Sequence, residues 1–185
     1  MNMIQERTLQ TERIYQGKVV SLRVDTVELP TGRSTTREIV EHGGCTAIVA
    51  IDSDDNVLLV RQYRKAVERM LLEIPAGGLD PGEDPLDCAR RELAEETGFT
   101  AERWEQLTVF FTSPGFCTED MHLYLATELR PQKRAADDDE NIELVRIPLG
   151  TVTELIDSGE ICDAKSIAGL LMALRRRRAG SATSP

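Results

Sequence analysis

The stretch GGLDPGEDPLDCARRELAEETGF, residues 77–99, decides the fold of this chain. Its central part is predicted to form a helix that starts after Asp84, because aspartate is a favoured N-cap and Pro85 suits the first helical position. Asp87 favours the positive end of the helix dipole, and Gly98 fits the left-handed position after a last helical turn. The stretch is therefore a glycine-rich turn that leads into a helix with defined ends.

Three carboxylates gather near the end of this helix. Residues three and four apart share one face of a helix, so Glu92, Glu95 and Glu96 point the same way. Like charges this close repel each other. A divalent cation makes the arrangement favourable, because hard cations such as Mg²⁺ bind carboxylate oxygens. A solvated acidic face is the ordinary interpretation of two adjacent glutamates, but the spacing of the whole stretch favours a metal site.

The same helix has an apolar side. Leu86, Ala89 and Leu93 form a stripe at helical spacing, which predicts that this side packs on the core. The carboxylates lie at the edge of the stripe, so we expect them to be partly buried. Arg91 lies four residues before Glu95 and can brace it through an ion pair.

Composition favours a soluble protein with one globular domain. The chain has 185 residues, of which 41% are hydrophobic. Its net charge of −10 argues against general nucleic-acid binding, which needs basic surface. The four cysteines are scattered without CxxC spacing, which indicates a reduced, cytoplasmic protein. The sequence contains no run of about 18 apolar residues, so no membrane span is expected. The N-terminus does not resemble a signal peptide.

The N-terminal part predicts a small antiparallel sheet. Residues 1–10 are polar and are expected to be loosely held, whereas residues 20–25 alternate between apolar and polar side chains, as a half-buried strand does. Residues 30–33 (PTGR) form a turn signal, after which residues 35–41 can return antiparallel. Such a sheet is marginal alone, so we expect it to pack on the main domain or on a second subunit.

The remaining chain predicts a mixed sheet with helices on its faces. Residues 45–51 are continuously apolar, as in a strand that is buried on both sides. Helices are expected at residues 151–156 and 164–178, and a disordered tail at 179–185. Further strands are expected at residues 57–63, 71–74, 106–112, 121–126 and 144–148. The arginines at 175–178 are expected to be a basic helix end, with a nucleic-acid or lipid role as the less favoured interpretation.

Residues 77–99 match the pattern G-x5-E-x7-R-E-U-x-E-E-x-G-U, in which U is a bulky apolar residue. This is the Nudix box, and the chain resembles Nudix hydrolases; Phe99 occupies a position that is more often aliphatic. The resemblance implies an α/β fold, an α/β/α sandwich around a mixed sheet, here with an added N-terminal antiparallel sheet. It also implies hydrolysis of a nucleoside diphosphate linked to another group. The predicted boundaries are residues 1–42 for the N-terminal sheet, 43–178 for the catalytic domain and 179–185 for the tail.

The resemblance also implies which residues bind metal. Glu92 and Glu96 are expected to bind Mg²⁺, or Mn²⁺ in its place, with help from Glu95 and from the backbone carbonyl of Ala76. Such ions activate a water molecule and neutralise charge on the phosphates. Glu83 and Arg91 are expected mainly to brace the box. Gly77, Gly78 and Gly82 are expected to serve backbone turns, and Gly77 and Gly78 are also candidates for close approach of phosphate.

A second motif points to one branch of the family. Pro114, in the loop SPGF, lies 16 residues after Gly98, an offset that is typical of ADP-ribose pyrophosphatases. Other short segments are similar to the same branch: RQYR at 61–64, EIPAG at 73–77, and Glu119 after the loop. The expected reaction converts ADP-ribose and water into AMP and ribose 5-phosphate.

This branch implies further substrate contacts. Arg64, and less strongly Arg61, are expected to contact phosphate or the terminal ribose, because a planar guanidinium matches phosphate oxygens. In similar homodimers the N-terminal sheet swaps across and helps to bind adenine, which makes Lys18 and Val19 candidates here. Both arginines, and Lys18, also have the simpler interpretation of solvated surface cations.

The base that activates water is expected outside the box. Related enzymes draw a glutamate from the loop that here carries the acidic run at 137–140. Glu140 fits this position best, as base, as metal ligand or as both, with Asp138 as the alternative. A mobile, solvated loop is an almost equal interpretation of this run. Three other functions remain open: the same chemistry on a nucleotide sugar or dinucleoside polyphosphate, a regulator that senses ADP-ribose without cleaving it, and hydrolysis of oxidised nucleoside triphosphates.

Overall fold

The computed structural model describes residues 5–132 and 142–181. The chain divides into two compact units. One unit contains Met1–Gly44 together with Phe111–Asp120, and the other contains Cys45–Phe110 together with Met121–Pro185. The structure thus groups a segment from the middle of the chain with the N-terminal strands. The predicted boundaries divide the chain into consecutive ranges and therefore do not include this grouping. We call these the N-terminal unit and the catalytic unit.

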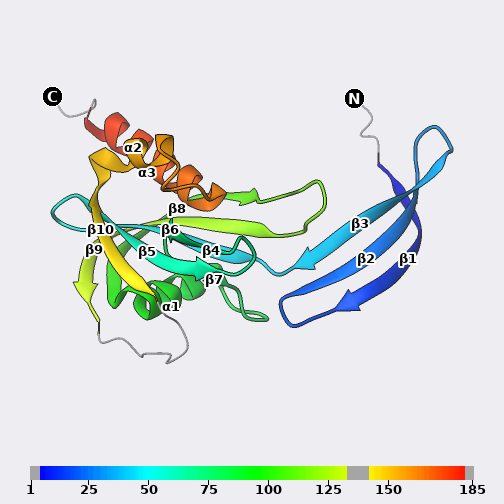
Figure 1. Cartoon of the computed structure of the whole chain (residues 1–185), viewed down its shortest axis with the longest axis horizontal. Helices are drawn as coiled ribbons and strands as arrows, with labels where there is room; N and C mark the ends of the chain where they lie inside the picture. The colour runs from blue at the N-terminus through cyan, green and yellow to red at the C-terminus, as the bar shows by residue number, and fades with distance from the viewer. Residues whose placement is uncertain (1–4, 133–141, 182–185) are drawn as a thin grey trace. The chain divides into compact units, whose positions relative to one another are not determined.

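The N-terminal unit is built on a three-stranded antiparallel sheet in the order β1-β2-β3 (Figure 1). Its strands are β1 (Arg7–Gln16), β2 (Val20–Glu28) and β3 (Ser34–His42). The expectation that residues 1–10 are loosely held is wrong for residues 7–10, which lie in β1 and pair with β2. Every residue of β1 is exposed, so this strand has no buried alternation by which the sequence could reveal it.

The segment at 111–120 joins this sheet through its backbone. Val40 of β3 donates its N–H to the carbonyl of Phe116 at 2.8 Å and accepts the N–H of Thr118 at 3.0 Å. Thr118 also binds the backbone of His42 through its hydroxyl. The unpaired edge of β3 is therefore covered locally by the loop that carries Pro114.

A mixed seven-stranded sheet forms the centre of the catalytic unit. Its path runs β10-β5-β4-β9-β8, with β6 on β5 and β7 on β4. The β4–β9 pair is parallel, whereas β10–β5, β4–β5, β4–β7 and β5–β6 are antiparallel, which confirms the predicted mixed sheet. The strands are β4 (Cys45–Ile51), β5 (Asn56–Arg64), β6 (Arg69–Glu73), β7 (Ala76–Gly78), β8 (Phe99–Phe111), β9 (Asp120–Pro131) and β10 (Glu143–Pro148).

Helices cover both faces of this sheet (Figure 1). Strand β4 is buried nearly throughout, and its side chains alternate between two core clusters. Val49 and Ile51 lie in one cluster with Leu170 of α3 (Ala164–Ser181), while Ile48 lies in the other with Leu93 of α1 (Pro85–Thr97). The short helix α2 (Val152–Asp157) adds to the α3 side. The predicted α/β/α sandwich is confirmed.

The ends of α1 agree with the sequence prediction. The Asp84 side chain accepts the backbone N–H groups of Leu86 and Asp87, and Gly98 has φ 73°. Helix α3 instead continues to Ser181, so the expectation of a disordered tail is wrong for residues 179–181. Among the described residues, no helix is long and apolar enough to cross a membrane.

Candidate active site

The three glutamates of α1 differ strongly in exposure. Glu96 is 5% exposed, and the Glu92 side chain is only slightly more accessible, whereas the Glu95 side chain is 40% exposed. Leu93 beside them is fully buried. The carboxylates thus lie at the edge of the buried stripe, as the spacing predicts.

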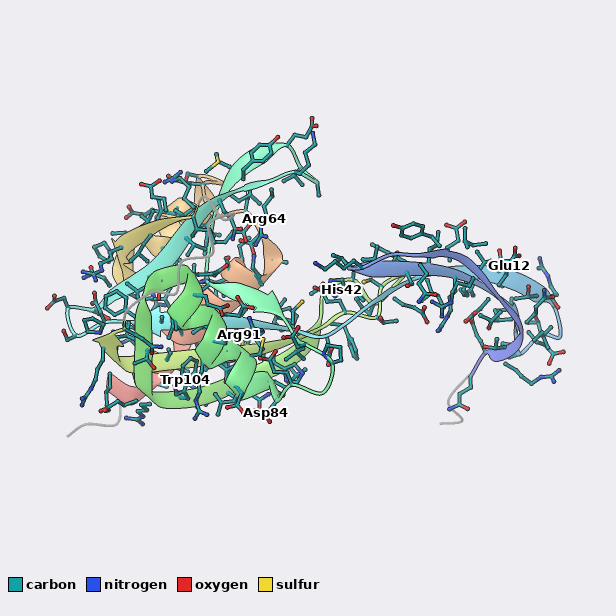
Figure 2. The ribbon with its side chains drawn as sticks, turned by 90° about the horizontal axis from the view of Figure 1, so that it is seen from below. Glu12, His42, Arg64, Asp84, Arg91 and Trp104 are labelled. Carbon is teal, nitrogen blue, oxygen red and sulfur yellow. The ribbon has the colours of Figure 1, made fainter. Side chains whose placement is uncertain are left out.

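Arg91 binds the carboxylates on either side of it (Figure 2). Its Nη1 lies 2.6 Å from Oε1 of Glu92 and 3.1 Å from Oε2 of Glu95. Its Nε and Nη2 bind both oxygens of Glu83 at 3.0 Å. These hydrogen bonds, with one from the backbone N–H of Asp80, lower the pKa of Glu83 to about 2. Arg91 therefore braces the helix against the preceding turn, as predicted.

The turn before α1 lies directly against the buried carboxylates. Ala76 donates its backbone N–H to Oε2 of Glu96 at 3.0 Å. A Cβ atom on Gly77 would lie 2.0 Å from both Cδ and Oε1 of Glu92. Only glycine leaves room for the Glu92 carboxylate in this position. Strand β7 holds the turn through its pairing with β4.

Cys88 of α1 binds the same turn through its side chain. Its Sγ donates to the carbonyl of Gly78 at 3.3 Å, and Nη2 of Arg91 donates to the same carbonyl at 3.3 Å. Burial raises the pKa of the Cys88 thiol to about 11. The thiol is thus a neutral hydrogen-bonding and packing group. Gly78, a candidate for phosphate contact, is exposed, and a Cβ there would meet no atom within 4 Å.

Arg64 and Arg61, the two arginines of β5 expected to contact substrate, have different partners. Arg64, which Figure 2 labels, forms a two-pronged ion pair with the buried Glu73. Glu73 also binds Lys165 of α3. Hydrogen bonding to Glu73 raises the pKa of Arg64, and the charge of Glu96 adds to the same effect. Arg61 instead pairs with exposed Glu160 at 3.4 Å and with Glu143 at 3.7 Å.

The candidates in the N-terminal unit lie on turns and loops. Lys18 and Val19 form the exposed turn between β1 and β2. Pro114 lies in an exposed turn in which the carbonyl of Ser113 accepts two backbone N–H groups. Glu119 follows that turn and accepts the hydroxyl of Thr112 at 2.5 Å.

Glu140 and its alternative Asp138 lie outside the described residues. Two other residues were missed by the sequence analysis, Glu73 and Lys165. A charged residue between Leu72 and Ile74 is the signal that could have identified Glu73 as buried and paired. Lys165 is 92 residues away from Glu73 in the chain, and no local pattern connects the two.

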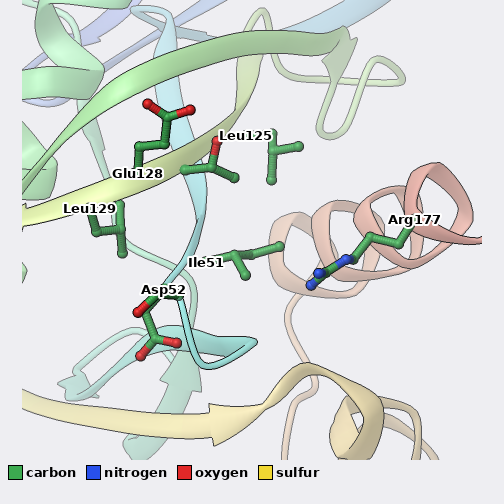
Figure 3. Close-up of a pocket in the computed structure, with 8 residues that line it drawn as sticks. Ile51, Asp52, Leu125, Glu128, Leu129 and Arg177 are labelled. Carbon is green, nitrogen blue, oxygen red and sulfur yellow. The ribbon is translucent and has the colours of Figure 1, made fainter. Parts of the chain in front are cut away.

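A separate pocket of about 410 Å³ lies at the Ile51 end of β4 (Figure 3). Leu125 and Leu129 form part of its apolar wall, and Asp52 and Arg177 supply polar groups. Arg177 also pairs with Asp55, and Arg176 pairs with Glu105. The basic end of α3 is thus partly neutralised within the chain. None of the described residues predicted for the active site lines this pocket.

The donor set of the box fits a hard divalent cation. Glu92, Glu95 and Glu96 offer only carboxylate oxygens, and the backbone of Ala76 contacts Glu96 through its N–H. Magnesium and manganese prefer such oxygen ligands, whereas zinc favours histidine and cysteine. The buried position of Glu96 also favours a bound cation, because an ionised carboxylate away from water needs compensating charge.

Comparisons with known proteins agree with this geometry. The NUDIX domain model matches residues 41–169, and the model of a nucleoside diphosphate sugar hydrolase N-terminal domain matches residues 6–40. The ADP-ribose pyrophosphatase of Bacillus subtilis is 44% identical over 90% of this chain and 91% of its own. The ADP-ribose pyrophosphatase of Mycobacterium tuberculosis is 41% identical over 89% of this chain and 81% of its own.

Other relatives carry different names. The methanol dehydrogenase activator of Bacillus methanolicus is 45% identical over 89% of this chain and 90% of its own. The GDP-mannose pyrophosphatase of Salmonella arizonae is 33% identical over 89% of this chain and 93% of its own. A crystal structure of an ADP compounds hydrolase superposes with a TM-score of 0.88 over 97% of this chain and 98% of its own, at 24% identity, which shows a shared fold.

Replacing Gly77 by alanine tests the close approach of Glu92. The new Cβ would overlap the Glu92 carboxylate, and this flexible side chain would swing away at little cost in stability. We expect the affinity for Mn²⁺, measured by electron paramagnetic resonance titration without substrate, to fall about tenfold or more. The melting temperature should change little. Gly78→Ala is the matched control, and equal Mn²⁺ affinities in both variants would contradict the proposed position of Glu92.

Proposed function

Because this chain belongs to the Nudix hydrolase family, we propose that it is an ADP-ribose pyrophosphatase, which cleaves ADP-ribose into AMP and ribose 5-phosphate. The observation that carries this proposal is the 44% and 41% identity to two ADP-ribose pyrophosphatases over about nine-tenths of the chain. The relatives match both the box and the N-terminal strands. The match of residues 6–40 to an N-terminal domain of nucleoside diphosphate sugar hydrolases supports the same substrate class.

Nudix hydrolases typically use a divalent metal ion, which we propose to be Mg²⁺, with Mn²⁺ as a substitute. When bound, such an ion polarises phosphate oxygens and favours ionisation of a water molecule. Glu92, Glu95, Glu96 and the carbonyl of Ala76 would hold it. Arg91 keeps Glu92 and Glu95 in place through its ion pairs, and the N–H of Ala76 orients Glu96.

The diphosphate itself needs positive charge and hydrogen-bond donors. Arg64 supplies both, because its guanidinium is permanently charged and planar and its side chain is 40% exposed. Gly78 leaves the backbone accessible to a phosphate, since it carries no side chain. Arg61 is a weaker candidate, because two glutamates already compete for it.

We assign Glu140 as the base that takes a proton from the attacking water, with Asp138 as the alternative. The support is chemical: the four glutamates of the box are engaged with Arg91, with the Ala76 N–H or with the proposed cation, so another carboxylate suits the proton transfer better.

We further propose a homodimer in which the N-terminal sheet contributes to the substrate site of the second protomer. Leu9, Ile14 and Tyr15 of β1 and Val19 of the following turn are all exposed. This many exposed apolar side chains on one small sheet supports the burial of this surface against a second copy of the chain. Lys18 and Val19 would contact adenine, while Pro114 and Glu119 would help to select the substrate. The four cysteines form no disulfide, which supports a cytoplasmic location.

The substrate is tested by a panel with Mg²⁺ and with Mn²⁺. ADP-ribose should give AMP and ribose 5-phosphate with kcat/KM at least about tenfold above GDP-mannose, dinucleoside polyphosphates and oxidised nucleoside triphosphates. The comparison with GDP-mannose matters because a relative is named for it. Absence of AMP from the ADP-ribose reaction would sink the proposal.

Two glutamate-to-glutamine variants separate metal binding from proton transfer. Glu96→Gln keeps an oxygen for the Ala76 N–H but loses a charge, so kcat should fall by about a hundredfold or more while the protein stays folded. Glu140→Gln should lower kcat by about 10²–10⁴-fold with substrate binding kept. Glu68→Gln, at an exposed position, is the control. Wild-type turnover in Glu96→Gln would remove Glu96 from the metal site, and unchanged kinetics of Glu140→Gln at every pH would exclude it as base.

The oligomeric state is tested by light scattering after gel filtration. The full chain should be a dimer, and removal of residues 1–41 should give an inactive monomer. Ile14→Asp introduces a charge on the exposed face of β1 without removing the sheet, and it should also weaken the dimer. A truncated chain that remains dimeric and active would contradict the proposal.

A further inference from the structure

Glu73 is a buried carboxylate outside the box. It ends β6, between Leu72 and Ile74, and its side chain is 2% exposed. Burial on its own would raise its pKa, but hydrogen bonds from Arg64 and the charge of Lys165 overcome this effect, and the pKa is lowered. Glu73 is therefore a buried anion that depends on two cations.

Glu73 holds one edge of the Arg64 guanidinium. Nε of Arg64 lies 3.1 Å and 3.3 Å from the two Glu73 oxygens, and Nη2 lies 2.7 Å from Oε2. A guanidinium has five N–H groups in a rigid plane. The contacts with Glu73 use the Nε and Nη2 edge, so the orientation of the remaining N–H groups is fixed by Glu73.

The first turn of α3 holds Glu73 in turn. Lys165 Nζ lies 2.6 Å from Oε2 of Glu73 and 2.8 Å from Oδ1 of Asp163. Asp163 also accepts the backbone N–H of Ser166 at 3.1 Å, and Oγ of Ser166 accepts that of Ile74 at 2.9 Å. Both the side chain of Glu73 and the backbone that follows it are thus attached to α3.

The exposure of the four charged side chains separates their roles. Glu73, Lys165 and Asp163 are 2%, 14% and 16% exposed, whereas Arg64 is 40% exposed. The charges of the group sum to zero, and Arg64 is its more accessible cation. Without Lys165, Arg64 alone would neutralise the Glu73 carboxylate. Because Lys165 neutralises part of this negative charge, the charge of Arg64 stays available to a phosphate.

We propose that Lys165 and Glu73 are positioning residues, which orient Arg64 toward the diphosphate and keep its charge available. This inference rests on the proposed function, in which Arg64 contacts the substrate. It adds a role for α3, whose first turn lies far from the box in the sequence. A purely structural ion network predicts instead that loss of Lys165 lowers stability without acting through Arg64.

A double-mutant cycle distinguishes these two roles. Lys165→Met should lower kcat/KM for ADP-ribose about tenfold or more, mainly through KM. In an Arg64→Ala background the same change should have an effect of less than about twofold, because the group that it positions is absent. Lys165→Arg should recover part of the activity. The control is Lys65→Met, because Lys65 is an exposed lysine that pairs with exposed Glu68, and its replacement should leave kcat/KM unchanged. An equal effect in both backgrounds would overturn the proposal.

A measurement without substrate keeps this test separate from the identity of the substrate. In ¹⁵N spectra, the Nε–H signal assigned to Arg64 by its loss in Arg64→Ala should be shifted and protected from exchange in the wild type. Lys165→Met should move it toward the signals of solvated arginines, and Lys65→Met should not. An unchanged signal in Lys165→Met overturns the positioning role. If the signal moves but ADP-ribose is not cleaved, the proposed substrate fails and the positioning role stands.

Discussion

Repulsion among the glutamates of α1 is the constraint on which the site depends. Three carboxylates within about one turn of a helix would destabilise it if they were left alone. Arg91 offsets part of this cost by binding two of them and Glu83 together. The third, Glu96, is held by a backbone N–H and is almost fully buried. The remaining negative charge is of the kind that a divalent cation compensates.

Rigid packing makes this charged arrangement possible. Both faces of β4 are buried, so the sheet fixes α1 on one side and α3 on the other. The turn that approaches Glu92 and Glu96 is paired to the same strand through β7. Helix α3 reaches the site from the opposite face through Lys165 and Ser166. The central strand therefore sets the distances among groups that come from three different elements.

The sequence predicted the parts of the structure that local patterns determine. The caps of α1, its apolar stripe and the contact between Arg91 and Glu95 all follow from residue spacing within one helix. The first part of β1, residues 7–10, was expected to be loosely held, because none of its residues is buried. The pairing of Lys165 with Glu73 and the grouping of residues 111–120 with the N-terminal strands were missed for another reason. They join segments that are distant in the chain, and only the folded topology brings these together.

The box cannot by itself select ADP-ribose, because relatives named for different substrates match about the same share of the chain. The relatives illustrate this: a GDP-mannose pyrophosphatase and two ADP-ribose pyrophosphatases all match about nine-tenths of the chain. Discrimination between bases requires polar groups that are left unpaired by the wrong base. Arg91 is bound by glutamates of the box, and Arg64 is bound by Glu73. Selection of the nucleoside therefore needs groups other than the carboxylates of the box.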